Sequence, residues 1–146
     1  MRTLAIDFGK RRIGLALSDA GGKLATPHEV LQTSSISQAV DEISKTIEHE
    51  GVERIVIGMP LNMDGTRGGG AKEVTEFGLL LSKRCGKGVI YVDERLSTFQ
   101  AEQDLLDARR GGEKITRKSK KQRLDAVAAA SFLQEFLDGK LDPIDA

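Results

Sequence analysis

Hydrophobic positions along the chain follow two patterns: short continuous runs, and stretches in which they recur every three or four residues. Apolar runs bounded by turn residues are typical of strands in a buried sheet, and five are present, at residues 3–9, 12–19, 24–31, 54–60 and 88–93. The longer spacing predicts four helices, at residues 36–50, 71–84, 97–109 and 122–137. Three strands followed by alternating helices and strands predict a hairpin meander that continues through right-handed crossovers into parallel strands. The predicted fold class is therefore α/β, with a mixed five-stranded sheet flanked by helices.

Individual residues support several of these boundaries. Pro27 has no amide hydrogen for a strand ladder, which predicts a sheet edge or a bulge at its strand. Ser35 or Ser37 is suited to cap the helix at residues 36–50, and Gly51 to end it. We expect the basic segment before the last helix to form a loop.

The composition narrows the class of protein. A chain of 146 residues is long enough for one domain with its own core, which we expect at residues 1–138, with a short tail at 139–146. Cys85 is the only cysteine, which excludes an internal disulfide framework and a cysteine-rich zinc site. No apolar run approaches the ~18 residues of a membrane span, and the chain opens directly into a strand pattern. We therefore expect a cytoplasmic protein with no membrane partner.

The charge is balanced overall but unevenly distributed, with 22 basic and 22 acidic residues. Residues 109–123 contain eight basic residues and one acidic residue, a net charge of +7, which leaves −7 on the rest of the chain. A local basic patch attracts polyanions whatever the total charge, although a solvated loop without a partner is the alternative. From this segment we expect nucleic-acid binding by Lys114, Arg117, Lys118, Lys120, Lys121 and Arg123.

Two predicted strands end in carboxylates. Asp7 lies at the edge where open α/β sheets place ligands, and a buried carboxylate there requires a cation, either a metal or an arginine. The alternative is that Asp7 caps the turn at Gly9. Asp93 and Glu94 end another strand, and only one of them can readily join Asp7, because side chains alternate along a strand. The alternative is that Asp93 and Glu94 form an ordinary capping segment between this strand and the helix that follows it.

A third carboxylate, Asp125, lies on the last predicted helix. It is one turn before the core-facing stripe of Ala129, Phe132, Leu133 and Phe136, and on the same side. A buried ion pair with an arginine would explain it, but we favour a functional role. Three carboxylates from two strand ends and a helix suit Mg²⁺ or Mn²⁺. Two such ions about 4 Å apart would activate water on one side of a phosphodiester and stabilise the leaving oxygen on the other.

Four motifs, in this order, resemble the YqgF/RuvX family. They are Asp7-Phe8-Gly9 with Arg12-Ile13-Gly14-Leu15-Ala16, Gly58-Met59-Pro60 with Asp64-Gly65, Asp93-Glu94-Arg95 with Ser97-Thr98, and Asp125-Ala126-Val127-Ala128-Ala129-Ala130. The resemblance implies the RNase H-like fold of the RuvC resolvases. It also implies a metal-dependent nuclease that processes the 5′ end of pre-16S rRNA and leaves a 5′-phosphate and a 3′-hydroxyl. A Holliday junction resolvase acting on four-way DNA is the alternative.

The resemblance also implies roles for individual residues. Asp7, Glu94 and Asp125 match the catalytic, metal-binding acids, with Asp93 as the reserve ligand in place of Glu94. Arg12 and Arg95 are candidates for orienting phosphate or the carboxylates. The chain departs from RuvC at residues 58–60, where a resolvase strand carries a catalytic glutamate, so the metal site is expected to be assembled differently.

Other functions fit the sequence less well. The turn after Asp7 is similar to the phosphate loop of actin-like ATPases, but those proteins bind nucleotide between two such domains and this chain supplies one. A non-catalytic module that docks on nucleic acid is the second alternative. No base-reading motif separates pre-rRNA from branched DNA as the partner. A two-fold junction would favour a homodimer, whereas trimming of a single strand would suit a monomer.

Overall fold

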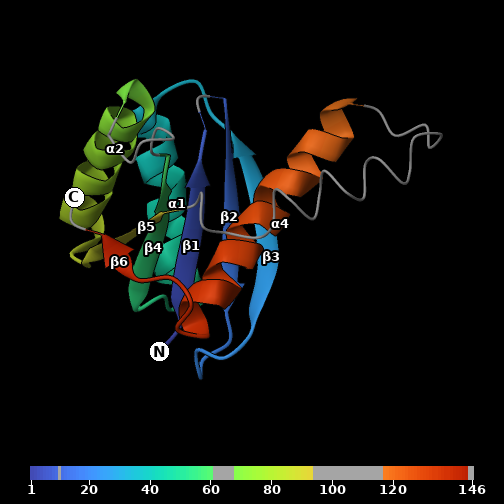
Figure 1. The fold of residues 1–146 in the computed structure, drawn as a ribbon. Coiled ribbons are helices and arrows are strands. Elements are labelled where there is room, and N and C mark those ends of the chain that lie inside the picture. The colour runs from blue at the N-terminus through green and yellow to red at the C-terminus, as the bar shows by residue number, and fades with distance from the viewer. Residues whose placement is uncertain (10, 61–67, 94–116, 145–146) are drawn as a thin grey trace.

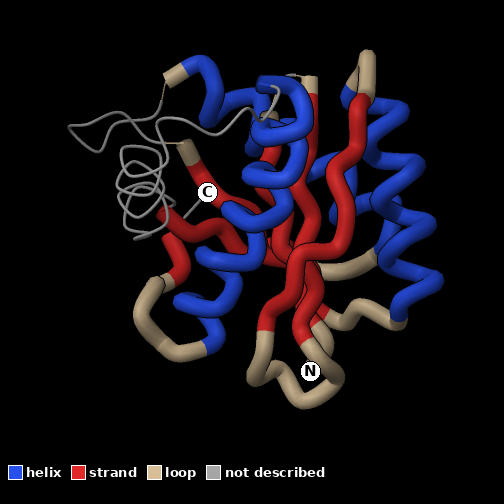
Figure 2. The backbone as a smooth tube through the Cα atoms, turned by 90° about the vertical axis from the view of Figure 1, so that its right-hand side faces the viewer, coloured by secondary structure: helices blue, strands red, loops and turns tan. Residues whose placement is uncertain are grey.

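The computed structural model describes residues 1–9, 11–60, 68–93 and 117–144. In these ranges a mixed sheet lies between helices on its two faces, as the side view in Figure 2 shows. The strands are β1 (Thr3–Phe8), β2 (Arg12–Ser18), β3 (Ala25–Gln32), β4 (Arg54–Met59), β5 (Val89–Asp93) and β6 (Pro143–Ile144). The helices are α1 (Ile36–Glu50), α2 (Gly69–Cys85) and α4 (Arg117–Leu137) (Figure 1).

The sheet has the strand order β3-β2-β1-β4-β5-β6. Strands β1, β2 and β3 form an antiparallel meander, and β1, β4 and β5 are parallel neighbours. This is the predicted α/β class with a mixed sheet, and the five predicted strands are all present. The sixth strand, β6, pairs antiparallel with β5 and was not predicted; its two residues lie in the segment expected to be a tail. So short a strand has no apolar periodicity of its own.

Strand β3 is an edge strand, as the proline at its centre predicted. Leu15 of β2 pairs with Glu29 and the next residue, Ala16, pairs with Pro27, so the register shifts and His28 is left over. A bulge at this place accommodates the residue that cannot donate to the ladder. The two possibilities stated for Pro27, an edge and a bulge, therefore both hold.

The two faces of the sheet are packed differently. The face under α1 and α2 carries large side chains, including Leu4, Ile6 and Ile57. The face under α4 carries smaller ones from the same strands, including Ala5 and Ala16. A helix on that second face can approach the strand backbone closely, which places α4 near the carboxyl end of β1.

The helix boundaries agree with the sequence except at α4. Ser35 caps α1 by accepting a hydrogen bond from the Gln38 amide at 3.1 Å, and Gly51 ends it with a φ of 66°. Helix α4 begins at Arg117, five residues before the predicted start, so the end of the basic segment is helical and not a loop. Arg, Lys and Gln are good helix formers, and no Gly or Pro interrupts residues 117–137. The helix predicted at residues 97–109 lies outside the described residues.

Candidate active site

Asp7 is the next-to-last residue of β1, and its strand neighbours determine which face it occupies. It alternates with Ala5, which belongs to the core under α4, and it pairs across the ladder with Gly14 of β2. Residues paired across a ladder project to the same face. The half-buried Asp7 therefore lies on the α4 face, at the carboxyl end of the central strand.

Gly14 brings α4 against this end of the sheet. A Cβ atom built on Gly14 would overlap the carbonyl group of Asp125 and lie 2.9 Å from the amide nitrogen of Ala126. The contact is between backbones, so only a residue without a side chain fits there. The strand residue that pairs with Asp7 is thus the one that touches Asp125 of α4, which brings the first and last predicted acids to one place.

Arg12 supplies a cation to this place. Its Nε atom lies 3.1 Å from Oδ2 of Asp125, and each side chain is 29% exposed. The contact is an ion pair without hydrogen-bond geometry, and both atoms are shielded from solvent. The arginine partner considered for Asp125 as the structural alternative is therefore present. An ion pair does not exclude a functional role. Arg12 also lies on the same sheet face as Asp7, because Asp7 pairs with Gly14, two residues further along β2.

Asp93 occupies the opposite face of the sheet. It alternates with Tyr91 and Val89, which pack in the core under α1 and α2, whereas Val92 packs in the core under α4. Asp93 is 7% exposed and pairs with Met59 of β4. Strand alternation therefore separates Asp93, the reserve ligand, from Asp7 and Asp125.

The other predicted site residues are described only in part. Glu94, Arg95 and Lys114 lie outside the described residues. The structure gives a helical backbone, without side-chain positions, for Arg117, Lys118, Lys120, Lys121 and Arg123. In the described ranges no group of three His, Cys, Asp or Glu residues could hold a metal ion.

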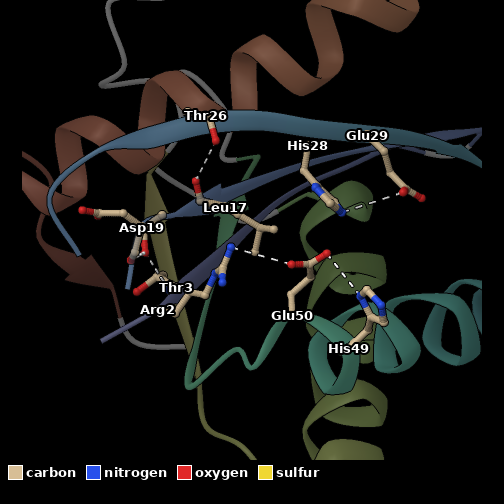
Figure 3. A network of polar contacts seen from close by, with 10 residues as sticks. Arg2, Thr3, Leu17, Asp19, Thr26, His28, Glu29, His49 and Glu50 are labelled. Atoms are coloured by element: carbon tan, nitrogen blue, oxygen red, sulfur yellow. Dashed lines mark hydrogen bonds and ion pairs between the residues drawn. The ribbon is translucent and has the colours of Figure 1, made fainter. Parts of the chain in front are cut away.

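The positioning role of Gly14 was not predicted from the sequence. A glycine inside an apolar strand often marks a close approach of another backbone, and that signal was available at residues 12–19. Both histidines, by contrast, are surface residues beside glutamates. His28 lies 3.9 Å from Glu29 on β3, and His49 lies 3.3 Å from Glu50 at the end of α1 (Figure 3).

Comparison with known proteins identifies the family. Residues 1–139 match the family described as "RuvX: Holliday junction resolvase". The chain belongs to the RuvX family. A RuvX relative from Syntrophomonas wolfei subsp. wolfei, named "Putative pre-16S rRNA nuclease", is 39% identical over 139 residues, which cover 95% of each chain. A protein of the same name from Halothermothrix orenii is 38% identical over 94% of this chain and 95% of its own.

A solved structure supports the fold of this RuvX chain. RuvC of Thermus thermophilus in complex with Holliday junction substrate has a TM-score of 0.60 and 16% identity, and the match covers 99% of both chains. The resemblance to the RuvX family and the predicted RNase H-like fold are thus confirmed. The family description and the names of the relatives support the predicted nuclease. No helix in the described part of this RuvX chain is long and apolar enough to cross a membrane.

Proposed function

We propose that this chain is a cytoplasmic, divalent-metal-dependent nuclease that processes the 5′ end of pre-16S rRNA. The observation that carries the proposal is the convergence of Asp7 and Asp125 on one sheet face, through the pairing of Asp7 with Gly14 and the contact of Gly14 with Asp125. The names of the relatives supply the substrate. The family description favours the second candidate, cleavage of four-way DNA junctions.

Mg²⁺ or Mn²⁺ suits the donor set, because carboxylate oxygens are the ligands that these hard cations prefer. In this proposal Asp7, Asp125 and Glu94 hold the metal. The placement of Asp93 on the opposite face supports Glu94 as the third ligand. When bound, such ions would supply Lewis-acid chemistry at the scissile phosphate and would activate water for attack.

The chain's own residues have two further tasks in this proposal. Asp7 and Asp125 are held by β1 and α4, and rigid elements fix the positions of their carboxylates more closely than loops would. Arg12 offsets the charge of Asp125 and thereby lowers the repulsion that a substrate phosphate meets at two carboxylates. The basic residues at 114–123 bind the nucleic-acid backbone, and Arg95 orients phosphate or the carboxylates.

A cleavage assay with the Asp7→Asn variant tests the proposal. Pre-16S rRNA fragments and four-way DNA junctions are offered side by side with Mg²⁺ or Mn²⁺. We expect cleavage of the rRNA fragment by the wild type, at least a 10²-fold loss in Asp7→Asn, and complete loss in chelator. Asp142→Asn, the same change at an exposed position near β6, is the matched control and should retain full activity.

The outcomes separate the candidate functions. Cleavage of junctions alone would make resolution of branched DNA the function, and a homodimer measured by light scattering would agree with it. Cleavage of RNA by a monomer would agree with trimming of a single strand. Wild-type activity in Asp7→Asn would refute the proposed metal site, and binding without cleavage would identify a non-catalytic module.

Neutralisation of the basic segment provides a second test. The triple change Lys118→Gln, Lys120→Gln and Lys121→Gln should reduce the slope of log Kd against log salt by about 2–3, since each lost phosphate contact changes that slope by about 0.7–0.9. Binding is measured by fluorescence anisotropy in chelator, so that no cleavage occurs. An unchanged slope would show that these lysines do not face the nucleic acid.

A further inference from the structure

A polar cavity of about 450 Å³ lies beside the ion pair of Arg12 and Asp125. It forms where the start of β2 pairs with the end of β3 and the chain turns into α1; Arg12 pairs with Gln32, and the Thr33 amide donates to the Arg11 carbonyl at 3.4 Å. Its lining residues are Arg11, Arg12, Gln32, Thr33, Ser34 and Gln38. None of the assigned functions uses this cavity.

The residues that line the cavity carry a net positive charge. Two of its lining residues are arginines and none is a carboxylate. Arg12 has Asp125 as its partner, whereas Arg11 is exposed and none of the ion pairs in the described part of the chain involves it. Five N–H donors in a planar fork, together with amide and hydroxyl groups nearby, match the oxygen atoms of a phosphodiester.

A neighbouring cavity shows the opposite charge. It has a volume of about 440 Å³, shares Thr33 and Ser34 with the first cavity, and is lined on its α2 side by Glu73 and Glu76. A polyanion beside Asp125 would be repelled from the acidic cavity and attracted to the basic one. The difference in charge between the two cavities therefore favours a path for the nucleic-acid strand over the cavity lined by Arg11 and Arg12.

We propose that the cavity of Arg11, Gln32, Thr33 and Gln38 binds a backbone phosphate of the nucleic acid, next to the phosphate at the cleavage site. This inference rests on the proposed nuclease function, because it takes its ligand from that function. Arg12 contacts Asp125 and also lines the cavity, so the proposed phosphate subsite adjoins the candidate active site. RNA and DNA share the phosphodiester, so both are expected to occupy it.

Arg11→Gln tests the subsite without changing a proposed metal ligand. The probes are a pre-16S rRNA stem-loop and a four-way DNA junction, with binding followed by fluorescence anisotropy in chelator at several salt concentrations. We expect roughly tenfold weaker binding, typical of one lost charge-assisted hydrogen bond, and a salt slope reduced by about 0.7–0.9. Lys83→Gln removes one positive charge from the exposed surface near the end of α2, and should leave both quantities unchanged.

A second variant places a negative charge in the cavity. Gln38→Glu is nearly isosteric and keeps the oxygen that accepts from the Ser34 amide at 3.3 Å. A glutamate at this position of the first turn is favourable for α1, so the fold is expected to persist. The variant also loses the hydrogen bond that the Gln38 side-chain amide donates to Glu42 at 3.4 Å. We therefore expect weaker binding of both probes, with an unchanged circular dichroism spectrum and a slightly lower Tm.

The outcomes distinguish this subsite from the nuclease function itself. A reduced slope on both probes, or on one of them, supports the subsite and shows which backbone it takes. Unchanged binding by Arg11→Gln and Gln38→Glu, with a wild type that binds and cleaves, overturns the subsite and leaves the nuclease intact. A reduced slope with no cleavage by the wild type supports phosphate binding in the cavity, but overturns the nuclease and, with it, the position next to a cleaved phosphate. Absence of binding by the wild type overturns both.

Discussion

Gly14→Ala is the change that most directly probes the convergence of Asp7 and Asp125. The added Cβ would overlap the carbonyl group of Asp125 and lie 2.9 Å from the Ala126 amide nitrogen, where contacts under 3.0 Å are essentially never seen. No rotamer relieves an overlap with backbone, so α4 must move away from β2 by about 1 Å. Gly14 does not have a positive φ, and the effect is therefore one of space and not of backbone strain.

Two quantities follow from that displacement. Overpacking of this kind costs about 1–3 kcal/mol, which should lower the free energy of unfolding and the Tm. A shift of about 1 Å between groups that act together can reduce activity by about 10²-fold. Because Asp125 moves with α4 and Asp7 stays with β1, we expect the loss of activity to exceed the loss expected from the unfolded fraction alone.

The assay pairs urea unfolding with cleavage of the rRNA fragment at a temperature where the variant is folded. Gly69→Ala is the control, since a Cβ there meets nothing within 4 Å in the first turn of α2. It should keep full activity and unfold at the same or higher urea concentration. If Gly14→Ala matched the wild type in both measurements, the close contact between β2 and α4 would be refuted, and with it the geometric basis of the site.

Three other predictions concern stability. Gln134→Ala removes two hydrogen bonds of 2.9 Å that connect α4 to Lys23 and to Ala25 at the start of β3, and should lower the free energy of unfolding by about 1–2 kcal/mol while leaving cleavage nearly unchanged. Ser35→Ala should cost about 1 kcal/mol in urea unfolding through loss of the α1 cap, and a smaller loss would show that another group caps the helix. Amides of Leu24 and Lys23 donate to Asp19 and hold its pKa below the ordinary 3.8, so its contribution to stability is present above that pH and lost as the pH falls through the lowered pKa. An NMR titration that placed the Asp19 midpoint at 3.8 or above would contradict this assignment.

Much of the fold could be predicted from the sequence because it depends on local chemistry. Apolar runs define strands, and the spacing around Val40 and Ile43 defines the buried side of α1. The sheet edge could be predicted from Pro27, because proline has no amide hydrogen to donate and is therefore excluded from a central strand. The start of α4 could not be predicted in this way, because a run of Arg and Lys is compatible with either a solvated loop or an exposed helix.

For the candidate site, too, the local features could be predicted from the sequence and the contacts between distant segments could not. The sequence by itself determined the residue types, the strand ends that carry them and the rule that Asp93 and Glu94 cannot share a face, since alternation is a local property of a strand. Only the tertiary structure decided that Asp7 and Asp125, 118 positions apart, lie on one face. It also decided which arginine pairs with Asp125, because several were equally available in sequence. These outcomes depend on ladder register and helix packing, which arise when distant segments meet and leave no periodic signal within either one.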